Sequence, residues 1–384
     1  MLRTQRLPTA RARAVPVEAT ESATERALAP RAVEQLLRIK GDLGLGLPVV
    51  LQDGREQTLV ALVESLTEER YRVMASLGAP ELALTLRRVE AIGVAWPEGS
   101  EVLRLAVPDT ADLAWLAAVA GRGRIDGLFD ALAGTHFQSG SAVQTAAIRL
   151  AKSTQKIPAA LTVPFTGDAA AAGLMTMSLR ELNAALDEAR QQERVSSAPL
   201  PMAVAQAGRV HVFRPDDGGV EHYAIEVGSP DLSGPVSVRL HSACFTGDVL
   251  GSLKCDCGPQ LRAAMTAMAA GNGGVLLYLN QEGRGIGLAN KMRAYVLQDA
   301  GLDTVEANHW LGFEDDQRDF RVGASILEQL GVSRVRLMTN NPAKVSILTG
   351  HGIEVVERLP LQVGCTEHNA HYLATKARKS GHLL

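Results

Sequence analysis

Cysteine is scarce in this chain, with four residues among 384 and none before Cys244. So few thiols exclude a small disulfide-stapled scaffold, and nothing else in the sequence indicates an oxidising compartment. No stretch is long and apolar enough to span a bilayer. A net charge of -3 and a pI near 6.3 also give no overall electrostatic basis for binding nucleic acid or a membrane surface.

The start of the chain lacks the apolar stretch and cleavage site of a secretory signal. It is rich in arginine and contains no acidic residue before Glu18. A targeting segment has a similar composition, but we prefer an unstructured tail over residues 1–30. We therefore expect a cytoplasmic protein.

The chain length indicates two domains after this tail, and we place their boundary near residue 200. The first domain, residues 31–200, combines helical patterns with strand-like stretches. Its helical patterns cover residues 31–44, 109–123 and 178–195, with Asp109 and Ser178 as expected N-caps. The run SSAPLPMA, residues 196–203, breaks the last pattern and predicts a linker.

The second domain, residues 201–384, alternates strands and helices. Short apolar runs such as GVLLYL, residues 274–279, predict buried strands, and longer periodic runs such as residues 288–302 predict helices. Together these patterns predict an α/β fold with mixed rather than purely parallel sheets.

Cys244, Cys255 and Cys257 lie close together in sequence. Thiolates are soft ligands that select zinc, and three of them leave a fourth position open for a water that zinc activates. Two alternatives stay open, namely small buried residues beside a turn and a Cys244–Cys255 disulfide. Cys255 and Cys257 flank a single residue and cannot easily form a relaxed disulfide with each other.

A glycine-rich loop containing Gly283, Gly285 and Gly287 precedes the helical pattern at 288–302. Glycines let backbone N–H groups approach an anion, and a helix N-terminus favours negative charge. Nearby positive charge comes from Arg284, Lys291 and Arg293. The spacing matches neither standard phosphate motif, so an ordinary strand–helix turn explains the loop equally well.

Four further candidates are Asp316 and Arg318 in an acidic–basic turn, Lys344 in a polar loop, and Tyr295 on a predicted helix. Asp316 and Arg318 either lie in a solvated loop or act beside a metal. In the second case Asp316 would accept a proton and Arg318 would bind a phosphate. Lys344 can meet a phosphate as a point charge. Tyr295 is either a core residue or part of the site.

Five segments in order resemble the GTP cyclohydrolase II family. They are HSACFTGDVLGSLKCDCGPQL, LLYLNQEGRGIGLANKMRAYVLQD, DTVEANHWLGFEDDQRDF, RLMTNNPAKV and YLATKARKSGHLL. The resemblance runs from about residue 210 to residue 384. It implies hydrolytic opening of the imidazole ring of GTP, the first step of riboflavin synthesis. Formate and pyrophosphate are released, and the product is a 2,5-diamino-6-ribosylamino-pyrimidinone 5′-phosphate.

The same resemblance implies roles for individual residues. Cys244, Cys255 and Cys257 match the zinc ligands. Asp316 matches a proton acceptor, Tyr295 an active-site tyrosine, and Arg318 a nucleophile at the α-phosphate or, equally, a charge clamp. The GTP-binding positions match Arg239, Gln260, Glu282, Gly283, Arg284, Thr304, Thr339 and Lys344. Magnesium is expected with the triphosphate, and the family suggests a homodimer.

Ala243 is the main departure from the family pattern, because many members carry glutamate there. Leu279 and Asn280 also replace residues that are often more polar or basic. These changes leave open a paralogue that acts on another nucleotide, such as a uridine nucleotide, or a non-catalytic nucleotide sensor. Gln260, with the retained tyrosine, aspartate and arginine, favours GTP.

Residues 48–76 faintly resemble the opening of 3,4-dihydroxy-2-butanone 4-phosphate synthase. Asp53, Arg55 and Glu56 remain of its acidic cluster, but residues 58–60 read TLV instead of a second acidic group. Too few carboxylates are left to hold magnesium. We expect a catalytically inactive domain kept for packing, assembly or regulation, and we assign no metal role to Cys365.

Overall fold

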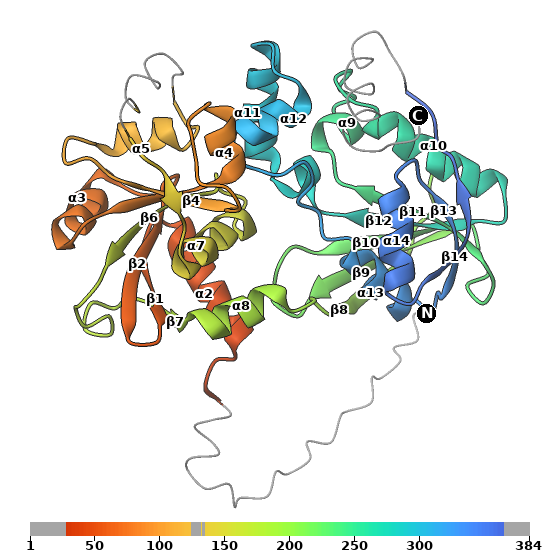
Figure 1. Ribbon diagram of the computed structural model, residues 1–384. Helices are drawn as coiled ribbons and strands as arrows, with labels where there is room; N and C mark the ends of the chain where they lie inside the picture. Colours follow the sequence, from red (N-terminus) through yellow and green to blue (C-terminus); the bar gives the residue numbers. More distant parts are fainter. Residues whose placement is uncertain (1–27, 124–131, 133–134, 365–384) are drawn as a thin grey trace, which may run out of the picture.

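The computed structural model describes residues 28–123, 132 and 135–364, and its strands form two seven-stranded sheets (Figure 1). Each sheet mixes parallel and antiparallel neighbours, so the predicted α/β fold with mixed sheets is confirmed. Most of the predicted tail, the last resembling segment and Cys365 lie outside the described residues. Among the described helices, none is long and apolar enough to cross a membrane.

The first sheet is formed by the N-terminal half of the chain and has the order β5-β4-β3-β6-β2-β1-β7. All neighbours are antiparallel except β1 and β7. Its strands are β1 (Val49–Asp53), β2 (Glu56–Leu62), β3 (Glu81–Thr85), β4 (Val102–Ala106), β5 (Gln138–Ser139), β6 (Ala159–Pro164) and β7 (Thr176–Ser178). The described helices of this half are α2 (Ala32–Gly44), α3 (Glu68–Leu77), α4 (Leu86–Ala91), α5 (Leu113–Val119), α7 (Ala142–Ser153) and α8 (Leu179–Asp187).

The second sheet belongs to the C-terminal half and has the order β14-β13-β11-β12-β10-β9-β8. Strands β11 to β14 are mutually parallel, and β8 to β10 add antiparallel strands at one side. The strands are β8 (Gln192–Pro199), β9 (Gly208–Pro215), β10 (His222–Val227), β11 (Val236–Ser242), β12 (Gly274–Leu279), β13 (Arg334–Met338) and β14 (Glu354–Leu359). The helices are α9 (Phe245–Asp248), α10 (Cys257–Ala270), the short η1 (Glu282–Gly285), α11 (Leu288–Asp299), α12 (Thr304–Trp310), α13 (Arg321–Gln329) and α14 (Pro342–Gly350).

The central parallel strands β11 and β12 are buried on both faces, as their continuous apolar runs predict. Leu276 and Leu277 are neighbours in β12 and therefore point to opposite faces. Leu276 packs in the cluster with Met268 of α10, whereas Leu277 packs in the cluster with Ile326 of α13. Helices on both faces thus fix the strands whose ends carry the candidate site.

Two sequence predictions for the N-terminal half need correction. Helix α5 is capped by Asp112, whose carboxylate accepts from the Trp115 N–H at 2.7 Å, and not by Asp109. The helix predicted over residues 178–195 ends at Asp187, although Ser178 caps it as expected. Residues 192–199 instead form β8, because pairing with β9 overrides a weak local helix preference and replaces part of the predicted linker.

Candidate active site

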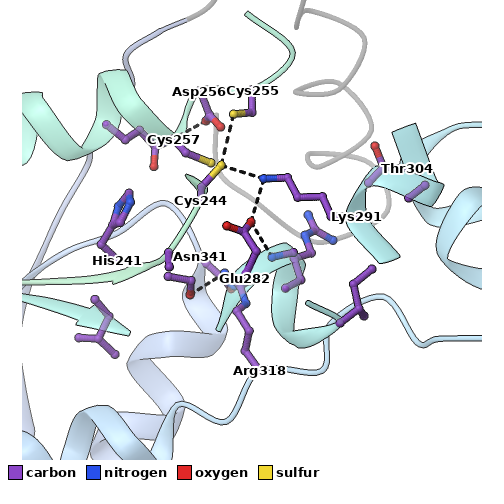
Figure 2. Close-up of a pocket in the computed structure, with 18 of the residues that line it drawn as sticks. His241, Cys244, Cys255, Asp256, Cys257, Glu282, Lys291, Thr304, Arg318 and Asn341 are labelled. Atoms are coloured by element: carbon purple, nitrogen blue, oxygen red, sulfur yellow. Dashed lines mark hydrogen bonds and ion pairs between the residues drawn. The ribbon is translucent and has the colours of Figure 1, made fainter. Parts of the chain in front are cut away.

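One pocket lies where the parallel strands β11, β12 and β13 end (Figure 2). Carboxyl ends of parallel strands meet at the same edge of a sheet, and ligands of open α/β sheets bind in the crevice outside that edge. The segments that follow these strands, residues 243–257, 280–287 and 339–344, all contribute to the lining.

The three cysteines converge at this edge. Cys244 follows β11, Cys257 begins α10 and Cys255 lies two residues before it, with all three sulfurs within 4.8 Å of one another. The Cys244 and Cys255 sulfurs are 3.7 Å apart, far beyond the roughly 2.05 Å of a disulfide. Tetrahedral zinc with sulfur bonds of about 2.3 Å places two sulfurs about 3.8 Å apart, so the triad fits zinc.

Gly247 makes this convergence possible. A Cβ atom at this position would lie 2.8 Å from the Cys255 sulfur and 3.1 Å from the Cys244 sulfur. Any side chain here would therefore push the cysteine loop apart. The short helix α9 needs glycine at the point where the chain passes the sulfurs.

Lys291 supplies the positive charge beside the sulfurs (Figure 2). Its Nζ lies 3.0 Å from the Cys244 sulfur, 2.9 Å from Thr246 Oγ1 and 2.9 Å from Glu282 Oε1. Hydrogen bonds from the Cys255 and Cys257 thiols, and then from Lys291, lower the pKa of Cys244. The sequence indicated a phosphate partner, but the structure directs this ammonium group to the thiolate.

Asp248 forms a buried network behind Cys244 that the sequence analysis missed. Its carboxylate accepts from the Cys244 N–H at 3.0 Å and from the Tyr278 hydroxyl at 3.0 Å. His241 Nε2 lies 3.0 Å from the same carboxylate, and burial lowers the pKa of this histidine. The run TGD inside the cysteine segment was the available signal, but sequence spacing does not show which backbone group a carboxylate will meet.

Arg239 of β11 and Gln260 of α10 form a further part of the lining. Arg239 is buried, donates to the Met338 carbonyl at 2.9 Å and also donates to Gln260 Oε1. Burial lowers the pKa of Arg239 to about 10, so the group stays charged at neutral pH. Its Nε is buried and has no hydrogen-bond partner among the described residues.

The glycine-rich loop is fastened to its neighbours by Glu282 and Gly285. Glu282 accepts from the Phe245 N–H at 2.6 Å and from Lys291, which ties this loop to the cysteine loop. Gly285 has a φ of +93°, and a Cβ there would lie 2.8 Å from the backbone of Gln317. The glycine-rich loop therefore contacts both the cysteine loop and the segment around Gln317. Arg284 adds a contact to that segment by donating to the Asp315 carbonyl at 3.1 Å.

Asp316 and Arg318 form a two-pronged ion pair. Arg318 Nε donates to Asp316 Oδ1 at 2.8 Å, and its Nη2 donates to the other carboxylate oxygen. Arg318 also donates to Ser242 Oγ at 3.2 Å and lies over the Phe320 ring. Burial raises the pKa of Asp316, but hydrogen bonds from Arg318 outweigh it and leave the pKa lowered.

Tyr295 and Lys344 reach the pocket from two helices, α11 and α14. Burial raises the pKa of Tyr295 to about 12, and the Lys291 ammonium lies 5.7 Å from the centre of its ring. Lys344 is buried and donates to the Leu240 carbonyl at 3.0 Å. Thr339 accepts from the Asn341 N–H at 3.0 Å and also lines the pocket.

The structure therefore brings the predicted residues together. The three cysteines, Tyr295, Arg318 and all eight predicted binding residues line the pocket, and Asp316 joins it through Arg318. Ala243 also lines the pocket. Leu279 is instead fully buried in the core, and Asn280 forms hydrogen bonds with Glu221 and His222. These two departures from the family pattern therefore make contacts within the sheet and its connections.

The family described as GTP cyclohydrolase II matches residues 193–360. The chain is 44% identical over 335 residues to GTP cyclohydrolase-2 from Azospirillum brasilense, covering 84% of this chain and 86% of that protein. It is 58% identical over 189 residues to GTP cyclohydrolase-2 from Azotobacter vinelandii, covering 49% of this chain and 89% of that protein.

Among solved structures, a two-domain 3,4-dihydroxy-2-butanone 4-phosphate synthase from A. baumannii matches 86% of this chain and 99% of its own. Its sequence identity is 18% and its TM-score is 0.30. This likeness is too distant to carry an argument about either half.

Proposed function

The chain belongs to the GTP cyclohydrolase II family, and we propose that its pocket opens the imidazole ring of GTP by hydrolysis. Formate and pyrophosphate leave, and the product is 2,5-diamino-6-ribosylamino-4(3H)-pyrimidinone 5′-phosphate, as in the first step of riboflavin biosynthesis. The observation that carries the proposal is the convergence of three thiols with Arg239, Gln260 and Arg318 in one pocket.

The cysteine triad would hold zinc, which when bound supplies Lewis acidity and activates water near neutral pH. The protein contributes the charge balance around the ligands. Lys291 offsets the negative charge of the Cys244 thiolate, and Asp248 fixes the backbone of that residue. Both contacts favour ligands that are ordered before the metal arrives.

The remaining lining divides into a base side and a phosphate side. Arg239 and Gln260 line the pocket side by side and would contact a planar base. Arg284, Arg318 and Lys344 supply positive charge for a triphosphate. Magnesium would be held mainly by the phosphates, because among the described residues only the cysteine triad forms a group able to hold a metal ion.

Arg318 suits a charge clamp on the phosphates better than a nucleophile. Its guanidinium is held by Asp316 and Ser242, and an arginine stays protonated at neutral pH. Asp316 has a lowered pKa in this pair, so it accepts a proton effectively only after GTP draws Arg318 away. Tyr295 keeps its proton because its pKa is raised to about 12, so it can donate it to a leaving nitrogen.

A second candidate is a cyclohydrolase that acts on another nucleotide, such as a uridine nucleotide. It is favoured by Ala243, which places a methyl group in the lining where many relatives carry a carboxylate. A non-catalytic nucleotide sensor is the third candidate, but binding alone does not require three converging thiols.

Incubation with GTP and separately with UTP separates these three functions when pyrophosphate and the ultraviolet absorbance of the base are followed for both nucleotides and formate is followed for GTP. We expect both products from GTP and neither from UTP. Pyrophosphate release and loss of the uracil absorbance with UTP, without turnover of GTP, would establish the second candidate. Tight GTP binding without either product, in protein that carries zinc, would leave only the sensor.

We further propose that the N-terminal half is a catalytically inactive relative of 3,4-dihydroxy-2-butanone 4-phosphate synthase. Asp53 and Glu56 face each other across the exposed β1–β2 turn, and two carboxylates are too few to cage magnesium. Formation of butanone phosphate from ribulose 5-phosphate by the purified protein would refute this. A cytoplasmic homodimer remains our prediction from the family, and sedimentation of the purified protein tests its assembly.

A further inference from the structure

Helix α11 has two working faces. Lys291 and Tyr295 are one turn apart and line the pocket, whereas Asn290 and Arg293 are one turn apart on another face. The second face meets the N-terminal half of the chain. In Figure 1, α11 and α12 lie between the two sheets, beside α4.

Glu64, which follows β2, makes the first anchor. Its carboxylate receives two hydrogen bonds of 3.0 Å from Arg293 and one of 2.8 Å from the Ile157 N–H, and its side chain is 10% exposed. Beside it, the Gln155 carbonyl accepts from the fully buried Asn290 at 2.8 Å. Paired oxygens and a guanidinium fork fix orientation as well as distance, so this anchor sets the rotation of α11.

Arg88 on α4 makes the second anchor, at the end of α12. It is 1% exposed and donates to the carbonyls of Val119 at 2.8 Å, Ala118 at 3.0 Å and Trp310 at 2.9 Å. Its guanidinium also lies 4.5 Å from the centre of the Trp310 ring. A cation at a helix C-terminus satisfies carbonyls that lack helical partners, so Arg88 fixes the end of α12.

The second anchor continues towards the Asp316–Arg318 segment. Thr85 Oγ1 donates to the Gly312 carbonyl at 2.7 Å, two residues after Trp310. Glu314 then pairs with Arg87 at 2.8 Å, but both side chains are more than a third exposed and add little. The buried contacts therefore end a few residues before the ion pair of the pocket.

We propose that Glu64 and Arg88 are positioning residues of the ring-opening site, through which the N-terminal half sets the placement of Tyr295 and Lys291. This rests on the proposed function. The relative from Azotobacter vinelandii matches only half of this chain but almost all of its own length, so it has little sequence to spare for such a half. In this chain, the contacts of the N-terminal half with α11 and α12 would affect catalysis, although that half carries out no reaction of its own.

The test is Glu64→Gln in the full chain, with Glu68→Gln as the matched control. Glu68 belongs to the same half and pairs with Arg72 at 3.0 Å, but this pair is exposed on α3. We expect kcat to fall about tenfold in Glu64→Gln, because small misplacements of reacting groups are costly. KM for GTP should change less than about twofold, because Arg239, Gln260 and Lys344 lie outside α11.

Arg293→Gln supplies the second variant and replaces a residue that is partly exposed. It should reproduce the kcat loss, and the double variant should lose little more than either single variant. If Arg293 served the phosphates instead, its substitution would raise KM for GTP and its effect would multiply with that of Glu64→Gln. That result would overturn the proposal.

Hydrogen exchange of residues 288–299 gives a readout that needs no turnover. Both variants should exchange faster there, with zinc content and the exchange of α10 unchanged. Unchanged kcat and unchanged exchange in folded Glu64→Gln would overturn the proposal. Absence of formate from GTP in the unsubstituted protein would instead sink the proposed function and leave the exchange result to judge the anchor.

Discussion

The two halves of the molecule each contain seven described strands in one sheet, and the pocket with its converging chemical groups lies at the edge of the C-terminal sheet. In that sheet, β11, β12 and β13 run parallel, so the segments that follow them meet at one edge. In the N-terminal sheet, all but one pair of neighbours run antiparallel, so successive connections alternate between opposite edges. Strand direction, more than strand number, explains why one half holds the pocket.

The halves also differ in what their polar residues do. In the C-terminal half, buried groups such as Asp248 and Arg239 contact the cysteine loop or line the pocket. In the N-terminal half, Glu64 and Arg88 point to the C-terminal helices α11 and α12. We therefore infer that the C-terminal half carries out the reaction and that the N-terminal half positions its helices. Substitutions in each half test this division of roles.

Cys257→Ser should have the largest effect. A hydroxyl is a harder and weaker ligand for zinc than a thiolate, so turnover of GTP should fall by roughly three orders of magnitude or more. Formate release and zinc per chain check this together. Full activity in this variant would show that the metal assignment is wrong.

Arg318→Lys should lower kcat/KM for GTP by roughly a hundredfold, since lysine keeps the charge but loses the planar fork. The charge-clamp role predicts residual activity that Arg318→Met lacks. Steady-state kinetics of both variants make the comparison. Equal activity of Arg318→Lys and Arg318→Met would show that the positive charge of Arg318 does not contribute to turnover.

Asp248→Asn should weaken zinc binding by roughly 10- to 100-fold, the usual effect of losing a group that orders a metal ligand. The amide cannot accept from the Cys244 N–H, His241 and Tyr278 as the carboxylate does. Competition with a chelator measures the loss. Asp231→Asn, at an exposed turn in the same half, serves as control and should keep normal zinc affinity.

His222→Gln should have the smallest effect on GTP turnover. It should change mainly how the free energy of unfolding depends on pH. Burial lowers the pKa of His222 to about 4 in the folded chain, against about 6.5 when unfolded. The unfolded chain therefore binds the proton first, and stability present above pH 6.5 is lost as the pH falls towards 4, by at most about 3 kcal/mol. Urea unfolding at several pH values between 4 and 6.5 gives the free energy of unfolding, which should depend less steeply on pH in the variant. An unchanged pH dependence would show that His222 is not the titrating group.

Much of the candidate site could be predicted from sequence because its residues are clustered in short segments. The cysteine triad and Gln260 lie within one such segment, and spacing alone indicated a soft metal. The Asp248 network and the Arg293–Glu64 pair were out of reach, since they join residues from separate elements. Strand β8 was also missed, because its pairing with β9 is a long-range effect that local propensity does not contain.

The most direct test of the central claim follows formate and pyrophosphate from GTP in one preparation of the full chain, before and after zinc is removed and returned. We expect equimolar formate and pyrophosphate, loss of formate when zinc is removed, and recovery of formate release when zinc is added back. Formate release that is unaffected by zinc removal, or GTP consumption that yields pyrophosphate without formate at full zinc loading, would contradict it.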